Sequence, residues 1–311
     1  MTKFAMVFPG QGSQAVGMLK DLAENYSVVK STFDDASQVL GYDLWTLVQE
    51  GPADELNKTW QTQPALLAAS VAIYRVWQSI NGPQPEFMAG HSLGEYSALV
   101  CAGVIDFKDA IKLVELRGKL MQEAVPSGTG AMFAIIGLDN DSIRKACEQA
   151  AQGQVVAPVN FNSPGQVVIA GNKEAVERAG ALCKEAGAKR ALPLAVSVPS
   201  HCALMKPAAD KLATTLNNMT FNAPQFAVIN NVDVKVESSA DNIKAALIAQ
   251  LYSPVRWTET VEEMAKQGVT LLVEMGPGKV LTGLTKRIVD SLSACAVNDK
   301  ASLDVAIENT K

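Results

Sequence analysis

The stretch from residue 85 to residue 105 constrains the fold more than any other part of the chain. "PEFMAG" (85–90) predicts a short β-strand, and "GEYSALVCAGVI" (94–105) predicts a buried helix. Between them, Gly90 and Gly94 flank Ser92 in a G-x-S-x-G pattern. Glycine at both positions lets a strand and a helix approach closely across a sharp turn that presents the serine hydroxyl. An ordinary glycine-rich turn is the alternative, but the strand–turn–helix context favours Ser92 as a nucleophile.

Strands and helices alternate along most of the chain, beginning with a predicted strand at "FAMVF" (4–8). This alternation indicates an α/β fold in which helices flank a parallel sheet, as in a hydrolase-like core. Residues 130–198 differ, because their predicted order is β-α-β-β-α-β, the ferredoxin-like pattern. We therefore expect a large hydrolase-like domain formed by residues 1–128 and 199–311. A small ferredoxin-like domain, residues 129–198, is predicted to be inserted into it.

Composition excludes several classes of function. The formal net charge is −5 and no basic run occurs, which argues against nucleic-acid binding. No apolar run is long enough to cross a membrane, and the N-terminal residues make a poor secretory signal. The five cysteines form no C-x-x-C motif, so we expect neither a disulfide framework nor a zinc site, and a cytoplasmic protein. Nothing in the sequence demands more than a monomer.

The chain has only two histidines, and a serine nucleophile usually needs one as its base. His91 directly precedes Ser92, and adjacent side chains at the end of a strand point in opposite directions. His91 is therefore predicted to pack against the turn or to orient it. His201 follows the predicted small domain, at a junction where the edge of a cleft is expected. This makes His201 the candidate base.

Arg117 lies on the apolar face of a predicted helix that begins after Asp106, a predicted N-cap. No carboxylate is placed three or four residues from Arg117, and burial of an unpaired charge is costly. A distant acid could pair with the guanidinium, or the side chain could reach outward to solvent. The third reading is a ligand carboxylate held by the guanidinium, which points to an acyl group carrying its own carboxylate. The apolar face consists of Phe107, Ala110, Val114, Met121 and Val125.

Eight motifs, in order, give the chain a family resemblance over nearly its whole length. It closely resembles the bacterial malonyl-CoA:acyl carrier protein transacylases. The motifs are "FPGQGSQ" (8–14), "QPALLAAS" (63–70), "GHSLGEYSAL" (90–99), "LRG" (116–118), "NFNSPGQVVIAG" (160–171), "VPSHCALM" (198–205), "QLYSPVRW" (250–257) and "EMGPGKVLTGL" (274–284).

The resemblance implies a set of catalytic roles. Ser92 would be acylated by malonyl-CoA, and His201 would act as general base and then as general acid. The backbone carbonyl of Gln250 would orient the imidazole in place of a carboxylate. The backbone N–H groups of Gln11 and Leu93 would form the oxyanion hole.

The resemblance also implies the substrates and the partner. Arg117 would bind the free carboxylate of the malonyl group, which is then passed to the phosphopantetheine thiol of acyl carrier protein in a ping-pong cycle. Such an exchange between thioesters needs no metal or redox cofactor. The carrier proteins of this family are acidic, so docking on an acidic enzyme requires a local basic patch. The candidate patch residues are Lys189, Arg190, Arg256, Lys279, Lys286 and Arg287.

Two other classes of function remain open at this point. A serine esterase or thioesterase would share Ser92 and His201, but it would not account for Arg117 on a buried face. A non-enzymatic acyl-binding module could retain the same turn as a scaffold. Transfer to a carrier thiol, compared with release of free malonate, separates the first alternative, and acylation by malonyl-CoA separates the second.

Overall fold

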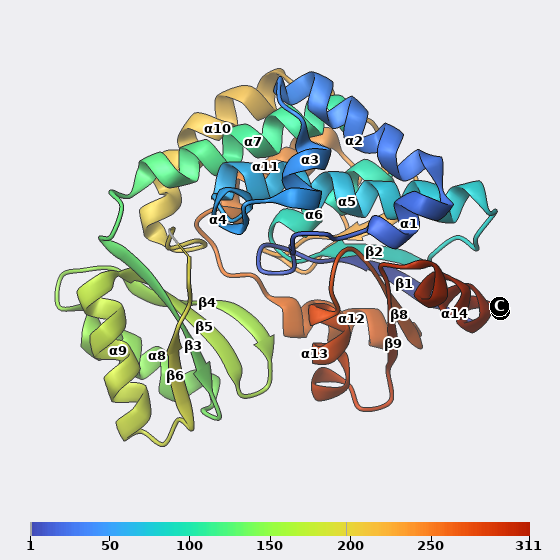
Figure 1. Cartoon of the computed structure of the whole chain (residues 1–311). Coiled ribbons are helices and arrows are strands. Elements are labelled where there is room, and N and C mark those ends of the chain that lie inside the picture. The colour runs from blue at the N-terminus through green and yellow to red at the C-terminus, as the bar shows by residue number, and fades with distance from the viewer. Residues whose placement is uncertain (1, 197) are drawn as a thin grey trace.

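A parallel five-stranded sheet forms the centre of the larger part of the molecule in the computed structural model, which describes residues 2–196 and 198–311 (Figure 1). The strand order is β7-β2-β1-β8-β9, and all four neighbouring pairs are parallel. The strands are β1 (Phe4–Phe8), β2 (Phe87–Gly90), β7 (Ala227–Ile229), β8 (Leu271–Met275) and β9 (Ser293–Val297). The predicted α/β fold class is confirmed.

Helices cover both faces of this sheet, as the alternation of side chains along β1 requires (Figure 1). Phe4, Met6 and Phe8 pack into the larger core, whereas Ala5 and Val7 pack into a smaller core on the opposite face. The smaller core is built with α12 (Trp257–Lys266) and α13 (Val280–Ile288). The remaining helices of this part are α1 (Lys20–Asn25), α2 (Ser27–Leu40), α3 (Leu44–Glu50), α4 (Ala53–Leu56), α5 (Thr59–Ser79), α6 (Leu93–Cys101), α7 (Phe107–Ala124), α10 (Lys206–Asn218), α11 (Ala240–Gln250) and α14 (Lys300–Thr310).

A separate antiparallel sheet with the order β4-β5-β3-β6 forms the smaller part of the molecule. Two helices pack on it around a core of their own, and the element order is the predicted β-α-β-β-α-β. The domain boundaries at residues 128/129 and 198/199 stay a prediction. The elements are β3 (Gly130–Ile136), α8 (Asn140–Ala151), β4 (Val156–Ser163), β5 (Gln166–Asn172), α9 (Lys173–Glu185) and β6 (Arg190–Pro193).

Two predicted elements are shorter than the sequence indicated. The helix predicted over residues 94–105 ends at Cys101, because Gly103 adopts a φ of 79° and Val104 N donates to Leu99 O, as in a Schellman motif. The strand predicted over residues 85–90 is also shorter, because β2 begins at Phe87.

Backbone hydrogen bonds join the small sheet to the larger part of the molecule at Val255, in the segment that precedes α12. Val255 N donates to Val159 O at 2.8 Å, and Phe161 N donates to Val255 O at 3.0 Å. Strand β4 of the small sheet is therefore fixed against the larger part, next to the ends of β1 and β2. Across residues 2–196 and 198–311, no helix has the length and apolar character needed to cross a membrane.

Candidate active site

The turn at Ser92 is a tight connection between β2 and α6. Ser92 has φ 52° and ψ −110°, a region that residues other than glycine rarely occupy. A Cβ atom at Gly90 would lie 1.9 Å from the backbone of Gly94, and one at Gly94 would lie 2.0 Å from Phe8 O. Both positions of the G-x-S-x-G pattern therefore require glycine. This packing places Ser92 at the N-terminus of α6, where the helix dipole favours negative charge.

His201 and Gln250 extend from Ser92 in a chain of hydrogen bonds. Ser92 Oγ lies 2.7 Å from His201 Nε2, and His201 Nδ1 lies 2.8 Å from the backbone oxygen of Gln250. A carbonyl oxygen can only accept, so Nδ1 carries the proton and Nε2 presents its lone pair to the Ser92 hydroxyl. This arrangement suits transfer of the serine proton to Nε2 during attack.

Arg117 is buried, with 1% of its surface exposed, on the apolar face of α7. Its Nη1 donates to Gln63 Oε1 at 2.8 Å. Its Nη2 donates to Gln250 Oε1 at 2.9 Å and lies 3.2 Å from Ser92 Oγ. Among the described residues, no Asp or Glu oxygen lies within 4.0 Å of the guanidinium nitrogens. The charge is therefore held by neutral partners and neither reaches solvent nor forms an ion pair.

A cavity of about 100 Å³ contains the reactive side chains. Ser92, His201 and Arg117 line it together, although they are far apart in the sequence. The backbone N–H groups of Gln11 and Leu93 have no acceptor within residues 2–196 and 198–311, and both residues line the same cavity. Its wall is completed by Met121, Met132, Asn160, Leu194, Val196 and Val198.

Burial keeps both imidazoles neutral. Burial and the nearby Arg117 charge lower the pKa of His201 to about 3. Burial likewise lowers the pKa of His91, whose Nε2 lies 2.8 Å from Asn162 Oδ1 and whose ring packs 5.7 Å from that of Trp257. His91 thus contacts the small sheet and α12, while His201 contacts the serine.

Three residues that the sequence analysis did not single out complete the hydrogen-bond network. Gln63 binds Arg117, and Glu95 and Asn231 bind Gln250. Gln63 and Glu95 are polar residues on the mostly apolar, buried helices α5 and α6, which is the same signal that identified Arg117. Asn231 follows β7 in a loop, where an asparagine carries no such signal.

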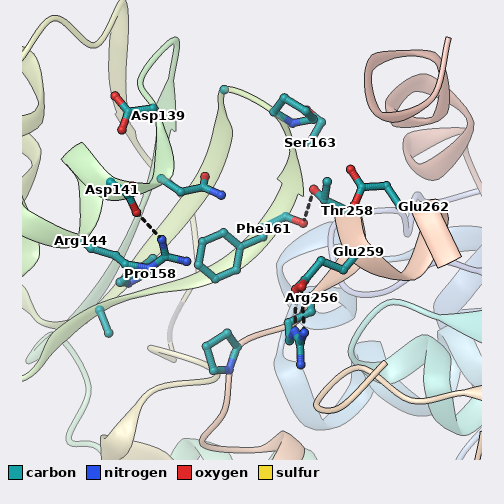
Figure 2. Close-up of a pocket in the computed structure, with 15 residues that line it drawn as sticks. Asp139, Asp141, Arg144, Pro158, Phe161, Ser163, Arg256, Thr258, Glu259 and Glu262 are labelled. Atoms are coloured by element: carbon teal, nitrogen blue, oxygen red, sulfur yellow. Dashed lines mark hydrogen bonds and ion pairs between the residues drawn. The ribbon is translucent and has the colours of Figure 1, made fainter. Parts of the chain in front are cut away.

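A second, larger cavity of about 1030 Å³ lies between the small sheet and α12 (Figure 2). Ser92, His201 and Arg117 do not line it. Its two arginines are bound by neighbouring acids, Arg144 by Asp141 and Arg256 by Glu259, as the dashed lines in Figure 2 mark. Reactive groups therefore converge in the smaller cavity rather than in this one.

Comparisons with known proteins agree on one family. The family model described as "Acyl transferase domain" matches residues 5–307. The malonyl CoA-acyl carrier protein transacylase of Escherichia coli K12 is 72% identical over 308 residues, which cover 99% of this chain and 100% of that protein. An acyl carrier protein S-malonyltransferase crystal structure from Vibrio cholerae is 75% identical, with a TM-score of 0.97 and coverage of 98% and 100%. A malonyl-transacylase in complex with a type II PKS acyl-carrier protein is also 75% identical, with a TM-score of 0.98 and coverage of 99% and 100%.

NMR of the imidazoles tests the protonation state of the site. A pKa lowered to about 3 means that His201 binds a proton only in strong acid. In ring-¹⁵N-labelled protein we expect His201 to remain the neutral Nδ1–H tautomer from pH 8 down to about pH 5, a lower limit well below the ordinary histidine pKa of about 6.5. The chain has only two histidines, so loss of one signal in His201→Ala assigns the spectrum. Titration of His201 near its ordinary pKa would contradict this account.

Proposed function

The chain belongs to the acyl transferase family, and from this premise we propose that it transfers the malonyl group of malonyl-CoA to the phosphopantetheine thiol of acyl carrier protein. The predicted family and enzyme class are confirmed by full-length relatives with the transacylase name. The observation that carries the proposed substrate is the buried Arg117 guanidinium, 3.2 Å from Ser92 Oγ and held by neutral groups. A cavity of about 100 Å³ that is lined by the Arg117 guanidinium suits a short acyl group that ends in a carboxylate.

Acylation begins when Ser92 Oγ attacks the thioester carbonyl of malonyl-CoA. His201 Nε2 takes the hydroxyl proton as the new O–C bond forms, and the amides of Gln11 and Leu93 donate to the developing oxyanion. The C–S bond then breaks, and His201 returns the proton to the leaving CoA sulfur. The malonyl group remains on Ser92 as an ester.

Transfer to the carrier reverses these steps with a different thiol. His201 removes the proton from the phosphopantetheine thiol, and the sulfur attacks the malonyl ester. The C–O bond to Ser92 breaks and the serine oxygen recovers the proton. One thioester replaces another, which supplies a fatty acid synthesis system with its extender units at nearly balanced free energy.

Arg117 links substrate selection to the strength of the base. After burial, its positive charge is the largest of the causes that lower the pKa of His201. A malonyl carboxylate bound to the guanidinium would offset that charge, so the imidazole would become more basic only when the correct substrate is present. An acetyl group, which lacks the carboxylate, would leave His201 weakly basic.

The basic patch for an acidic carrier is proposed to lie at the start of β6. Lys189 and Arg190 are exposed there, and Lys184 joins them by donating to Lys189 O at 3.0 Å. The chain runs from this patch along β6 to Leu194, so a single strand connects the patch to the wall of the active-site cavity. Arg256 is a poorer candidate, because its Nε and Nη2 both donate to the carboxylate of Glu259. Lys279, Lys286 and Arg287 form the alternative exposed group on α13 and at its N-cap.

We also propose that the protein is a monomer located in the cytoplasm. All five cysteines are free, and four of them are buried, which is consistent with a reducing compartment.

Replacement of Arg117 by alanine tests the proposed substrate. Removing a buried charged hydrogen-bond donor costs about 2–3 kcal/mol, so we expect kcat/KM with malonyl-CoA to fall at least about 30-fold. Transfer from acetyl-CoA should be unchanged or faster, because that donor has no carboxylate to bind. Steady-state transfer to holo acyl carrier protein with each donor measures both rates. An equal loss with the two donors would contradict the proposal.

Charge reversal tests the carrier patch. Arg190→Glu should raise KM for the acidic carrier and weaken its dependence on ionic strength, while acylation by malonyl-CoA alone stays unchanged. The matched control is Lys30→Glu on α2, an exposed position outside the cavity. An equal effect of the two reversals would move the carrier to another surface, with Lys286→Glu as the next variant.

A further inference from the structure

Glu95 is a buried carboxyl group for which the mechanism above has no role. It lies on α6, three residues after Ser92, with 2% of its surface exposed. Within the part of the chain that the structure describes, no Lys or Arg nitrogen lies within 4.0 Å of it. Its Oε2 accepts hydrogen bonds from Gln250 Nε2 at 2.9 Å and from Asn231 N at 3.0 Å. A buried acid held by neutral donors is costly, so its position calls for an explanation.

The side-chain amide of Gln250 bridges Glu95 and Arg117. Its Nε2 donates to Glu95 Oε2 and to Ser92 O, at 2.9 and 3.0 Å. Its Oε1 accepts from Arg117 Nη2 at 2.9 Å. An ionised carboxylate can only accept and a guanidinium can only donate, so the amide fits between them in one orientation. The reversed amide would direct its N–H groups at the guanidinium and its oxygen at the carboxylate.

The same carboxylate also holds the loop that brackets the Ser92 turn. Asn231 N donates to Glu95, which fixes the backbone of that loop. The Asn231 side chain then accepts from Ser92 N at 2.8 Å and donates to Gly90 O at 2.7 Å. Glu95 is therefore connected through Gln250 to the guanidinium and through Asn231 to the strained backbone of the nucleophile.

We propose that Glu95 is a positioning residue for carboxylate selection, acting through the Gln250 amide to hold Arg117 Nη2 beside Ser92 Oγ. Glu95 does not line the active-site cavity, so it acts through its neighbours rather than by contact with the acyl group. This inference rests on the proposed malonyl transfer.

The Gln250 amide separates the Glu95 carboxylate from the Arg117 guanidinium. The two charges can therefore compensate each other while the guanidinium donors stay free for the substrate. A carboxylate in direct contact with Arg117 would take the donors that the malonyl group needs. From its position beyond Gln250, the Glu95 carboxylate lowers the free-energy cost of burying the guanidinium without contacting it. Burial raises the pKa of Glu95 to about 7, with a smaller contribution from Asp233, although its bonds to Gln250 and Asn231 and the Arg117 charge favour the ionised form. The carboxyl therefore carries its full charge, and compensates the guanidinium, only above neutral pH. Asn230 and Glu237 face Glu95 across a cavity of about 10 Å³ on its other side.

Glu95→Gln tests the proposal when it is assayed at about pH 8, because it then removes the charge of an ionised carboxylate at nearly constant volume. We expect the ratio of kcat/KM for malonyl-CoA to that for acetyl-CoA to fall about 10-fold, mainly through a higher KM for malonyl-CoA. The matched control is Glu237→Gln, which neutralises the acid across the small cavity and does not contact Gln250, and it should keep the wild-type ratio. An equal loss with both donors in Glu95→Gln would overturn the proposal, because a purely structural role predicts that result.

A double-mutant cycle separates action through Arg117 from an independent effect. In an Arg117→Ala background, Glu95→Gln should leave the donor ratio unchanged, and a further fall in the ratio would overturn the proposal. If Glu95→Gln does not fold, Glu95→Asp carries the test, because it withdraws the carboxylate from Gln250 by one methylene and should also lower the ratio. A wild-type protein without malonyl transfer would refute the proposed function. A wild-type preference for malonyl-CoA that Glu95→Gln retains would refute this inference alone.

Discussion

A positive charge buried beside a serine hydroxyl is the interaction on which the proposed chemistry of this molecule depends. Removal of a guanidinium from water is costly, and among the described residues the oxygens that accept its hydrogen bonds are neutral ones, from Gln63, Gln250 and Ser92. The charge therefore remains available to an acidic acyl group. Together with burial, which has the larger effect, this charge keeps the adjacent imidazole of His201 neutral. In the proposed function the same guanidinium therefore selects the acyl group and sets the basicity of the imidazole.

The fold brings these groups together because parallel strands end on the same side of a sheet. Phe8 of β1 pairs with Gly90 of β2, so the turn that contains Gln11 and the turn that contains Ser92 lie next to each other. Arg117 lies on α7 and Gln250 is the last residue of α11. His201 lies in the segment that returns from the small sheet to the larger part. The cavity closes because β4 of the small sheet is bonded to Val255 of the larger part.

The sequence predicted those site residues whose local pattern leaves few alternatives. Close packing requires the glycines around Ser92, two histidines leave one candidate base, and helical periodicity places Arg117 among buried residues. The contribution of Gln250 came only from family resemblance, because a backbone carbonyl has no signature in side-chain pattern. Asn231 could not be predicted, since its role depends on a loop conformation set by tertiary contacts. Glu95 carried the same signal as Arg117, a charge on an apolar helix, and the sequence analysis did not use it.

Covalent capture of the acyl group shows whether Ser92 accepts the malonyl group from malonyl-CoA. Wild-type protein is mixed with malonyl-CoA in the absence of acyl carrier protein and quenched in acid. The mass of the intact protein is then measured by mass spectrometry. The account predicts a mass increase of one malonyl group on the wild type and none on Ser92→Ala. An adduct that persists in Ser92→Ala, or a wild-type protein that gains no mass, would contradict the assignment of Ser92 as the nucleophile that accepts the malonyl group.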